Sequence, residues 1–227
     1  MGRERVSDKK HRAQAIYEKL DAAMPEAEIE LDYRTPLELL VSVLLAAQST
    51  DKRVNQATPA LFARFTTAAD YARTTPAELQ TYIKTVGLFR NKSKALVKLG
   101  AMLVEKHAGE VPLTRAALAE LPGVGQKTAG VVSMHLGGDR AFPVDTHVTR
   151  LSGRMGFSTH EDPDDIEKDL RRLFPPEQWF QGHQLLVWHG RYVCHARSPE
   201  CHRCVIEALC PKRGVPPPRR TESHRSE

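Results

Sequence analysis

The chain has 227 residues, 41% of them hydrophobic, which is enough to bury a core in one domain or in two small ones. Its densest apolar run, residues 36–48, is shorter than the roughly 20 residues that cross a bilayer, and the charged N-terminus lacks the apolar segment of a secretory signal. This composition argues against an integral membrane protein and against a secreted one. We expect a cytoplasmic protein with no membrane partner.

The net charge of +5 lies at the two ends of the chain. Residues 1–12 and residues 212–227 each carry five Lys or Arg against two acids, and without them 23 basic residues face 24 acidic ones. Overall charge is therefore weak evidence for an anionic partner. Better evidence is the acid-free segment 79–104, which predicts a cationic stripe, although a solvated helix face is an equally open alternative. The cations of this stripe are Lys84, Arg90, Lys92, Lys94 and Lys98.

Helix start signals recur along the chain. Thr35 and Thr75 are each followed by a proline and, three residues after the threonine, by a glutamate, and Asp162 begins an acidic variant of this pattern. Apolar residues at helical spacing follow, for example at Leu96, Leu99 and Leu103. Alternating strand patterns are nearly absent. The sequence therefore predicts an all-α fold of about ten helices.

A glycine-rich turn separates two short predicted helices, residues 115–121 and residues 126–136. Gly123 and Gly125 allow positive φ and close backbone approach, so successive amides can form an anion nest at the N-terminus of the second helix. Such a helix-hairpin-helix would hold a nucleic-acid phosphate without reading its sequence. A tight turn with no ligand is the alternative.

Lys127 lies in the first turn of that second helix, which is the wrong end of a helix for a cation. The helix N-terminus and partial burial would both disfavour the protonated amine, and a neutral amine can attack carbon to form a Schiff base. A simple phosphate contact is the alternative. Downstream, Asp145 reads as the N-cap of the next helix. About ten helical residues advance about 15 Å, and residues 139–144 can span up to about 20 Å, so the chain can fold back and bring the Asp145 carboxylate near the Lys127 amine.

All four cysteines fall within 17 residues near the C-terminus: Cys194, Cys201, Cys204 and Cys210. This clustering predicts one shared ligand, either tetrahedral zinc or a [4Fe-4S] cluster, because two disulfides are unexpected without a secretion signal. The spacing alone does not separate zinc from iron and sulfur. In both cases the metal would stabilise a small C-terminal lobe.

Three motifs together resemble the endonuclease III family of DNA glycosylases: "LPGVGQKTA" at residues 121–129, "VDTHVTR" at residues 144–150, and the cysteine spacing. The resemblance covers about residues 12–211. It implies two helical lobes, a six-helix barrel that carries the hairpin and an iron-sulfur lobe built from both termini. The expected domains are residues 29–139 for the barrel, residues 1–28 with 140–213 for the iron-sulfur domain, and residues 214–227 as a disordered, proline-rich tail.

The resemblance also implies a function: a bifunctional DNA glycosylase and AP lyase that removes oxidised pyrimidines in base excision repair. Lys127 would be the Schiff-base nucleophile and Asp145 its carboxylate partner, with a [4Fe-4S] cluster on the four cysteines. The partner would be double-stranded DNA that contains damaged pyrimidines or abasic sites. The protein would act as a monomer in the cytoplasm, associated with the nucleoid through DNA.

Six further residues are candidate DNA contacts. By family analogy, Gln48 and Leu88 would fill the hole left by a flipped nucleotide, although a helix-end amide and a core leucine are the plain alternatives. Backbone amides at Gly123 and Gly125 would bind a phosphate. Lys92, in the cationic stripe, and Arg197, between the first two cysteines, complete the set. Glu200 in the same loop departs from the more basic loop of many relatives.

Three other functions stay open from the sequence. Two lie within the same superfamily: a mismatch-specific glycosylase and an enzyme that is mainly an AP lyase. Mismatch-specific branches usually lack a lysine at the hairpin, so Lys127 argues against the first. The third is a non-catalytic helix-hairpin-helix DNA-binding protein with a structural zinc. The pairing of Lys127 with Asp145 argues against it.

Overall fold

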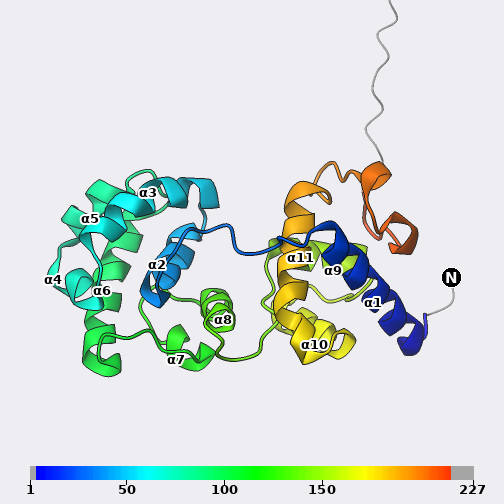
Figure 1. Ribbon diagram of the computed structural model, residues 1–227, viewed down its shortest axis with the longest axis horizontal. Helices are drawn as coiled ribbons and strands as arrows, with labels where there is room; N and C mark the ends of the chain where they lie inside the picture. The colour runs from blue at the N-terminus through cyan, green and yellow to red at the C-terminus, as the bar shows by residue number, and fades with distance from the viewer. Residues whose placement is uncertain (1–3, 216–227) are drawn as a thin grey trace, which may run out of the picture. The chain divides into compact units, whose positions relative to one another are not determined.

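The computed structural model describes residues 4–215, and the regular secondary structure in this part of the chain is all helical, with no strand (Figure 1). The predicted all-α fold is confirmed. Residues 216–227, most of the segment predicted as a disordered tail, lie outside the described residues. The described helices are α1 (Val6–Ala23), α2 (Pro36–Ala46), α3 (Asp51–Arg64), α4 (Ala68–Arg73), α5 (Pro76–Ile83), α6 (Phe89–His107), α7 (Arg115–Ala119), α8 (Gln126–His135), α9 (Thr146–Arg154), α10 (Pro163–Leu173) and α11 (Trp179–Tyr192), with short 3-10 turns η1 (Pro176–Gln178), η2 (Cys201–Arg203) and η3 (Glu207–Leu209).

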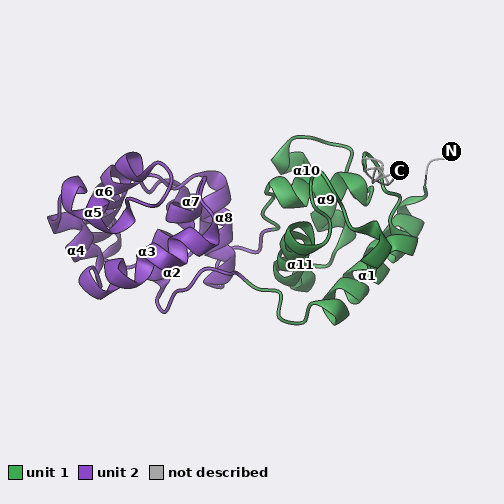
Figure 2. Ribbon diagram, turned by 90° about the horizontal axis from the view of Figure 1, so that it is seen from above, with its two compact units in different colours: residues 1–28, 142–227 green, residues 29–141 purple. Residues whose placement is uncertain are grey.

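The chain divides into two compact units, shown in separate colours in Figure 2. Unit 2 is the continuous segment Ile29–Ala141, and unit 1 combines the segments before and after it. Unit 2 contains six longer helices together with the five-residue α7. Unit 1 contains α1, α9, α10, α11 and the cysteine-rich segment, so the two ends of the described chain belong to one unit.

The predicted helix starts are confirmed by the caps that the structure forms. The side chains of Thr35 and Thr75 accept hydrogen bonds from the backbone N–H groups three residues ahead, and a proline occupies the first turn of each helix. Asp162 caps α10 through two backbone N–H groups in the same way. Each cap satisfies donors that a helix N-terminus leaves without an intrahelical partner.

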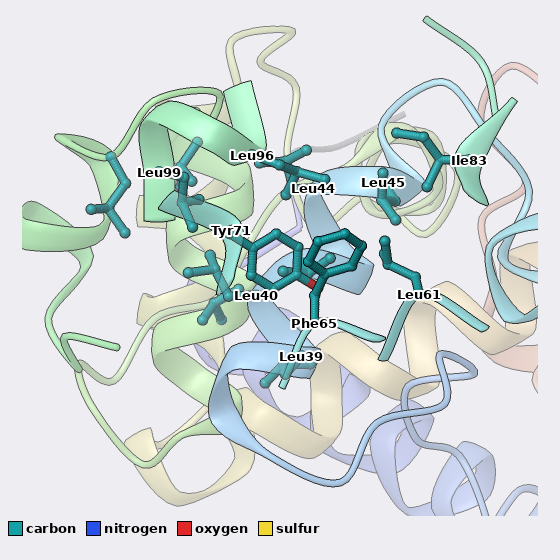
Figure 3. Close-up of a cluster of buried hydrophobic side chains, with 14 of the residues drawn as sticks. Leu39, Leu40, Leu44, Leu45, Leu61, Phe65, Tyr71, Ile83, Leu96 and Leu99 are labelled. Atoms are coloured by element: carbon teal, nitrogen blue, oxygen red, sulfur yellow. The ribbon is translucent and has the colours of Figure 1, made fainter. Parts of the chain in front are cut away.

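The core of unit 2 is built around α2, whose sequence is apolar on nearly every face. Figure 3 shows leucines of this helix meeting the aromatic pair Phe65 and Tyr71, whose ring centroids are 5.3 Å apart, and leucines of α6. Because α2 is buried on most sides, its C-terminal carbonyl groups must find their partners inside the protein. Lys92 of α6 is one such partner.

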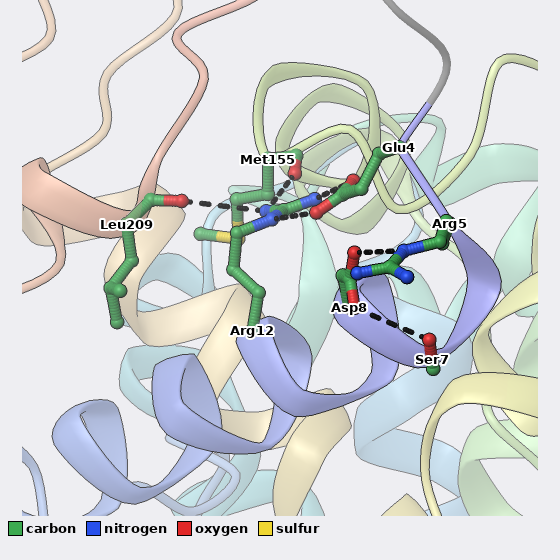
Figure 4. A network of polar contacts seen from close by, with 7 residues as sticks. All are labelled: Glu4, Arg5, Ser7, Asp8, Arg12, Met155 and Leu209. Carbon is green, nitrogen blue, oxygen red and sulfur yellow. Dashed lines mark hydrogen bonds and ion pairs between the residues drawn. The ribbon is translucent and has the colours of Figure 1, made fainter.

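The core of unit 1 joins α1 to helices from the far end of the chain. Arg12 on α1 makes this connection in Figure 4, where its Nη1 donates to the carbonyls of Met155, at 2.7 Å, and Leu209, at 3.4 Å. Its Nε and Nη2 donate to the Glu4 carboxylate. Arg12 thereby fixes α1 to the end of α9 and to the cysteine-rich segment. No helix in residues 4–215 is long and apolar enough to span a membrane.

Candidate functional site

The turn between α7 and α8 is held in the core of unit 2 by two apolar side chains. Leu121 and Val124 are buried, while Gly123 between them has φ +82° and lies so close to α6 that an added Cβ would meet the Ala95 Cβ at 2.8 Å. Gly123 is thus required by backbone conformation and by packing. Gly125 differs, because a Cβ added there would meet nothing within 4 Å. Its lack of a side chain instead leaves the start of α8 open to approach from outside.

Lys127 is the second residue of α8, as predicted, and its side chain is exposed. The expectation of partial burial is wrong. The buried face of α8 is formed by Ala129, Val132 and their neighbours, and Lys127 lies off that face. Gly125 is the N-cap of α8 and provides no side-chain cap for the N–H groups of the first turn. The Lys127 amine lies at this same end of the helix.

Asp145 is the N-cap of α9, which confirms its predicted structural position. Its Oδ1 accepts a hydrogen bond of 2.8 Å from the backbone N–H of Val148. The segment that leads into it is also fixed, since the N–H of Phe142 donates to Glu167 and the His183 ring contacts the Pro143 carbonyl at 2.8 Å. These contacts hold the Asp145 carboxylate in one orientation within unit 1, whereas Lys127 belongs to unit 2.

Two basic residues of α9, His147 and Arg150, follow Asp145 in the chain. Burial lowers the pKa of His147, and the Asp145 carboxylate acts in the opposite direction. Burial also lowers the pKa of the Arg150 guanidinium, which donates to the carbonyls of Gly190 and Cys194. His147 is therefore favoured as a neutral ring beside the carboxylate.

The four cysteines line one pocket in unit 1. All four thiols are free and partly buried. No group of three or more His, Cys, Asp or Glu in residues 4–215 is placed to hold a metal ion, and a single ion needs donors that converge to about 2.0–2.3 Å. Four cysteine sulfurs on one apolar pocket are the donor set that a [4Fe-4S] cluster requires.

Two further residues that line this pocket, Arg154 and His189, were not singled out from the sequence. Arg154, only 6% exposed, donates to the Cys194 Sγ at 3.2 Å and to the carbonyls of His195 and Ala196. The Nε2 of His189 lies 3.5 Å from the Cys204 Sγ, and burial lowers the pKa of this histidine to about 4. Burial raises the pKa of the Cys204 thiol and that of the Cys210 thiol, so a bound cation is needed to favour their thiolates.

Gln48 and Leu88 lie on two neighbouring loops of unit 2. Both side chains are exposed, and both residues have left-handed backbones, with φ of +55° and +57°. Leu88, at 52% exposed, is not the core leucine of the alternative interpretation. The loops touch, because the Gly87 N–H donates to the Ser49 Oγ at 2.9 Å. The structure thus brings these two predicted DNA contacts together.

Lys92 is not on the predicted cationic surface. Its side chain is buried, 6% exposed, and its amine donates to the carbonyls of Leu45 and Ala47 and to the Ser49 hydroxyl. The prediction that Lys92 contacts DNA from a surface stripe is therefore wrong. The other four cations of that stripe are exposed. Arg197 is exposed as well, and the nearby Glu200 carboxylate pairs with Arg203 and His195.

Comparison with known proteins places this arrangement in a defined class. Residues 41–176 match the HhH-GPD superfamily of base excision DNA repair proteins, and residues 194–210 match the iron-sulfur binding domain of endonuclease III. The first match covers more than half of the chain, so the fold and the hairpin define a helix-hairpin-helix base excision repair protein. The second supports the predicted [4Fe-4S] cluster over zinc.

The relatives narrow this class to one family. Endonuclease III of Bacillus subtilis (strain 168) is 44% identical over 194 residues, which are 85% of this chain and 89% of the relative. Endonuclease III of Escherichia coli (strain K12) is 42% identical over 186 residues, 82% of this chain and 88% of the relative. The chain belongs to the endonuclease III family, as its motifs predict.

Solved structures agree with this assignment. A trapped endonuclease III–DNA covalent intermediate matches with a TM-score of 0.85 at 42% identity, over 89% of this chain and 96% of that chain. A thermostable thymine-DNA glycosylase matches with a TM-score of 0.80 at 22% identity, a likeness that shows the fold alone.

Proposed function

We propose that Lys127 is the Schiff-base nucleophile of a bifunctional DNA glycosylase and AP lyase, with Asp145 as its carboxylate partner. Membership of the endonuclease III family supports both activities in base excision DNA repair. The observation that carries the residue assignment is the exposed Lys127 side chain, two residues after the open glycine turn at Gly125. An exposed amine beside a site that binds the DNA backbone can reach the sugar of a bound nucleotide.

The hairpin turn supplies that backbone site. The N–H groups at the start of α8 have no side-chain cap, and the helix dipole makes this end favourable for an anion. The open space at Gly125 allows a phosphate oxygen to approach the amides directly. Because these donors are backbone groups that bind phosphate, the interaction does not depend on the base sequence. A repair enzyme that works throughout a genome requires this independence.

The chemistry begins with attack of the Lys127 Nζ on the sugar C1′. The N–C1′ bond forms as the C1′–base bond breaks, and the base leaves with the bonding electron pair and a proton. Opening of the sugar ring gives an imine between C1′ and Lys127. Loss of a C2′ proton then expels the 3′ phosphate oxygen, which cuts the strand 3′ to the lesion. Water finally hydrolyses the imine and releases the lysine.

Asp145 supports this sequence electrostatically. Positive charge develops on the sugar as the base departs, and a carboxylate fixed in one orientation stabilises that charge without reorganisation during the reaction. The N-cap hydrogen bond to Val148 supplies the fixed orientation. A carboxylate can also accept a proton from the attacking amine.

The substrate in this proposal is double-stranded DNA with a damaged pyrimidine or an abasic site. Extrusion of the damaged nucleotide leaves a hole in the duplex. Gln48 and Leu88, exposed on touching loops, are the proposed side chains that fill it. Action as a monomer is part of this proposal. Such DNA would be met on the chromosome, in line with the predicted cytoplasmic, nucleoid-associated location.

The four cysteines are the proposed ligands of the cluster, with Arg154 holding the loop that contains the first of them. Iron bound to the thiolates would cross-link the C-terminal segment. This segment has only short 3-10 turns of its own, so it gains order from that cross-link. Arg197 projects from the same segment and is the proposed DNA contact there.

Borohydride trapping tests the nucleophile. With a duplex that contains thymine glycol, and separately with an abasic duplex, reduction should fix the imine as a covalent protein–DNA complex. Lys127→Ala should abolish the complex on both duplexes, because no other group replaces the attacking amine. A mass spectrum of the trapped peptide should place the adduct on Lys127.

Lys106→Ala is the matched control, because Lys106 is an exposed lysine of the same unit at the far end of α6. It should trap like the wild type. Undiminished trapping by Lys127→Ala would remove Lys127 from the mechanism. Trapping on the abasic duplex alone would support the AP lyase activity and reject the damaged pyrimidine as a substrate.

A further inference from the structure

Lys92 joins the two loops that carry Gln48 and Leu88. Its amine donates to the Leu45 carbonyl at 2.7 Å, the Ala47 carbonyl at 2.5 Å and the Ser49 Oγ at 3.3 Å. Its backbone N–H donates to the Leu88 carbonyl at 3.0 Å. A single residue therefore contacts both loops, one through its side chain and the other through its main chain.

The amine acts as the C-terminal cap of α2. The last carbonyls of a helix have no intrahelical partner, and α2 is buried on most sides, so these groups need a donor from the protein. A cation is favoured at this helix end by the dipole. The ammonium group has three N–H donors in a compact head, which matches the three acceptors around it. Burial lowers the pKa of Lys92 to about 8, so the site holds a lysine despite a desolvation cost.

Ser49 completes the connection between the loops. Its Oγ accepts from the Lys92 amine and also from the Gly87 N–H, which directly precedes Leu88. The contact leaves no spare room, because a Cβ added at Gly87 would lie 2.6 Å from the Gln48 carbonyl oxygen. The two loops therefore pack backbone against backbone.

The loops hold two residues in unfavourable backbone conformations. Left-handed φ values at non-glycine residues are unfavourable and persist only where the surroundings fix them. Gln48 and Leu88 both have such values, and both project to the surface instead of into the core. The hydrogen bonds that the Lys92 amine donates and that the Ser49 Oγ accepts hold the two loops in this arrangement.

We propose that Lys92 is a positioning residue that locks the Gln48 loop and the Leu88 loop into one rigid unit, shaped to occupy the duplex position vacated by an extruded nucleotide. The inference rests on the proposed function, because it assigns Gln48 and Leu88 to the DNA. Lys92 itself touches no DNA. It acts through the two side chains that it orients.

A mutant cycle tests this role. Lys92→Met removes the donor while keeping a long side chain, and should slow single-turnover release of thymine glycol on the order of tenfold. In a Gln48→Ala/Leu88→Ala background, the same substitution should cost less than about twofold, because the side chains that it positions are already gone. Equal losses in the two backgrounds, or no loss in the wild-type background, would overturn the proposal.

Two further variants keep the test decisive. Ser49→Ala removes the hydroxyl that accepts from the Gly87 N–H and from the Lys92 amine, and leaves both carbonyl bonds of Lys92. It should show the same non-additivity, so it replaces Lys92→Met if that variant folds poorly. Lys106→Met removes an exposed charge from the same helix and should leave the rate unchanged. A loss with Lys106→Met equal to that with Lys92→Met would contradict positioning, because it would reflect charge alone.

A binding measurement separates this inference from the mechanism at Lys127. Affinity for a duplex with a tetrahydrofuran abasic analogue needs the filled hole but no Schiff base. When this affinity is measured for the variants of the same mutant cycle, the losses should again be non-additive, even if Lys127 proves not to be the nucleophile. Additive losses of affinity would reject the role of Lys92 whatever the trapping experiment shows.

Discussion

Lys92 and Lys127 show how differently one residue type can be used within a single unit. The Lys127 side chain is exposed at an open helix start, where its amine can meet a ligand. The Lys92 amine is enclosed by two carbonyls and a hydroxyl and serves the protein itself. The difference has a thermodynamic consequence, because a buried amine loses hydration that an exposed one keeps.

Stability should therefore depend on pH through Lys92. Its pKa falls from 10.5 to about 8 on folding, because of burial. Below pH of about 8 both states bind the proton. Between about 8 and 10.5 only the unfolded chain binds it, so the free energy of unfolding rises with pH. The stability difference between wild type and Lys92→Met should grow by up to about 3 kcal/mol from about pH 7 to about pH 10. Denaturant unfolding curves at both pH values measure this, and a constant difference would contradict the burial effect.

At the scale of the element, α6 divides its cations between two tasks. Lys92 lies on the face that packs inward with Leu96, Leu99 and Leu103, at spacings of four, three and four residues. Lys94 and Lys98 lie off this face and are exposed. The helix thus keeps Lys94 and Lys98 on an exposed face and turns Lys92 to the interior.

Salt dependence should separate these tasks. Each phosphate contact contributes about 0.9 to the slope of log affinity against log salt concentration. Lys94→Ala should weaken binding to undamaged duplex and reduce that slope by about 1, whereas Lys92→Met should leave the slope unchanged. Fluorescence anisotropy at several salt concentrations measures both. An unchanged slope in Lys94→Ala would mean that the exposed cations of α6 form a solvated helix face that does not contact DNA.

What the sequence can predict follows from how local each signal is. The caps at Thr35, Thr75 and Asp145 depend on contacts within one turn, so they are read correctly from short patterns. The burial of Lys92 depends on carbonyls more than 40 residues away, which a count of charges cannot reveal. Its position four residues before Leu96 does contain the signal, because a lysine in an apolar register is a candidate for a buried role.

On the scale of the whole molecule, unit 1 depends on contacts between distant parts of the chain. Arg12 connects the first helix with Met155 and Leu209, and the Trp188 indole N–H donates to the Glu28 carbonyl at 2.6 Å. The segment from Cys194 to Cys210 contributes little packing of its own, since Ile206 is its one buried apolar side chain among the described residues. Leu209 and three of the cysteines are partly buried against the core of unit 1, and Arg12 and Arg154 donate to carbonyls of the segment. We expect the cluster to supply much of the remaining order.

Removal of the cluster should therefore loosen this segment selectively. Without iron, four thiols line an apolar pocket with no cross-link, so amide hydrogen exchange over residues 194–210 should rise by on the order of a hundredfold or more. Exchange in the core of α2 should stay slow, because unit 2 has its own buried core. Cys204→Ser, which removes one proposed ligand, should lose the brown colour of the cluster and show the same local pattern. Protection of residues 194–210 that persists in colourless, iron-free protein would show that packing, not the cluster, orders the segment.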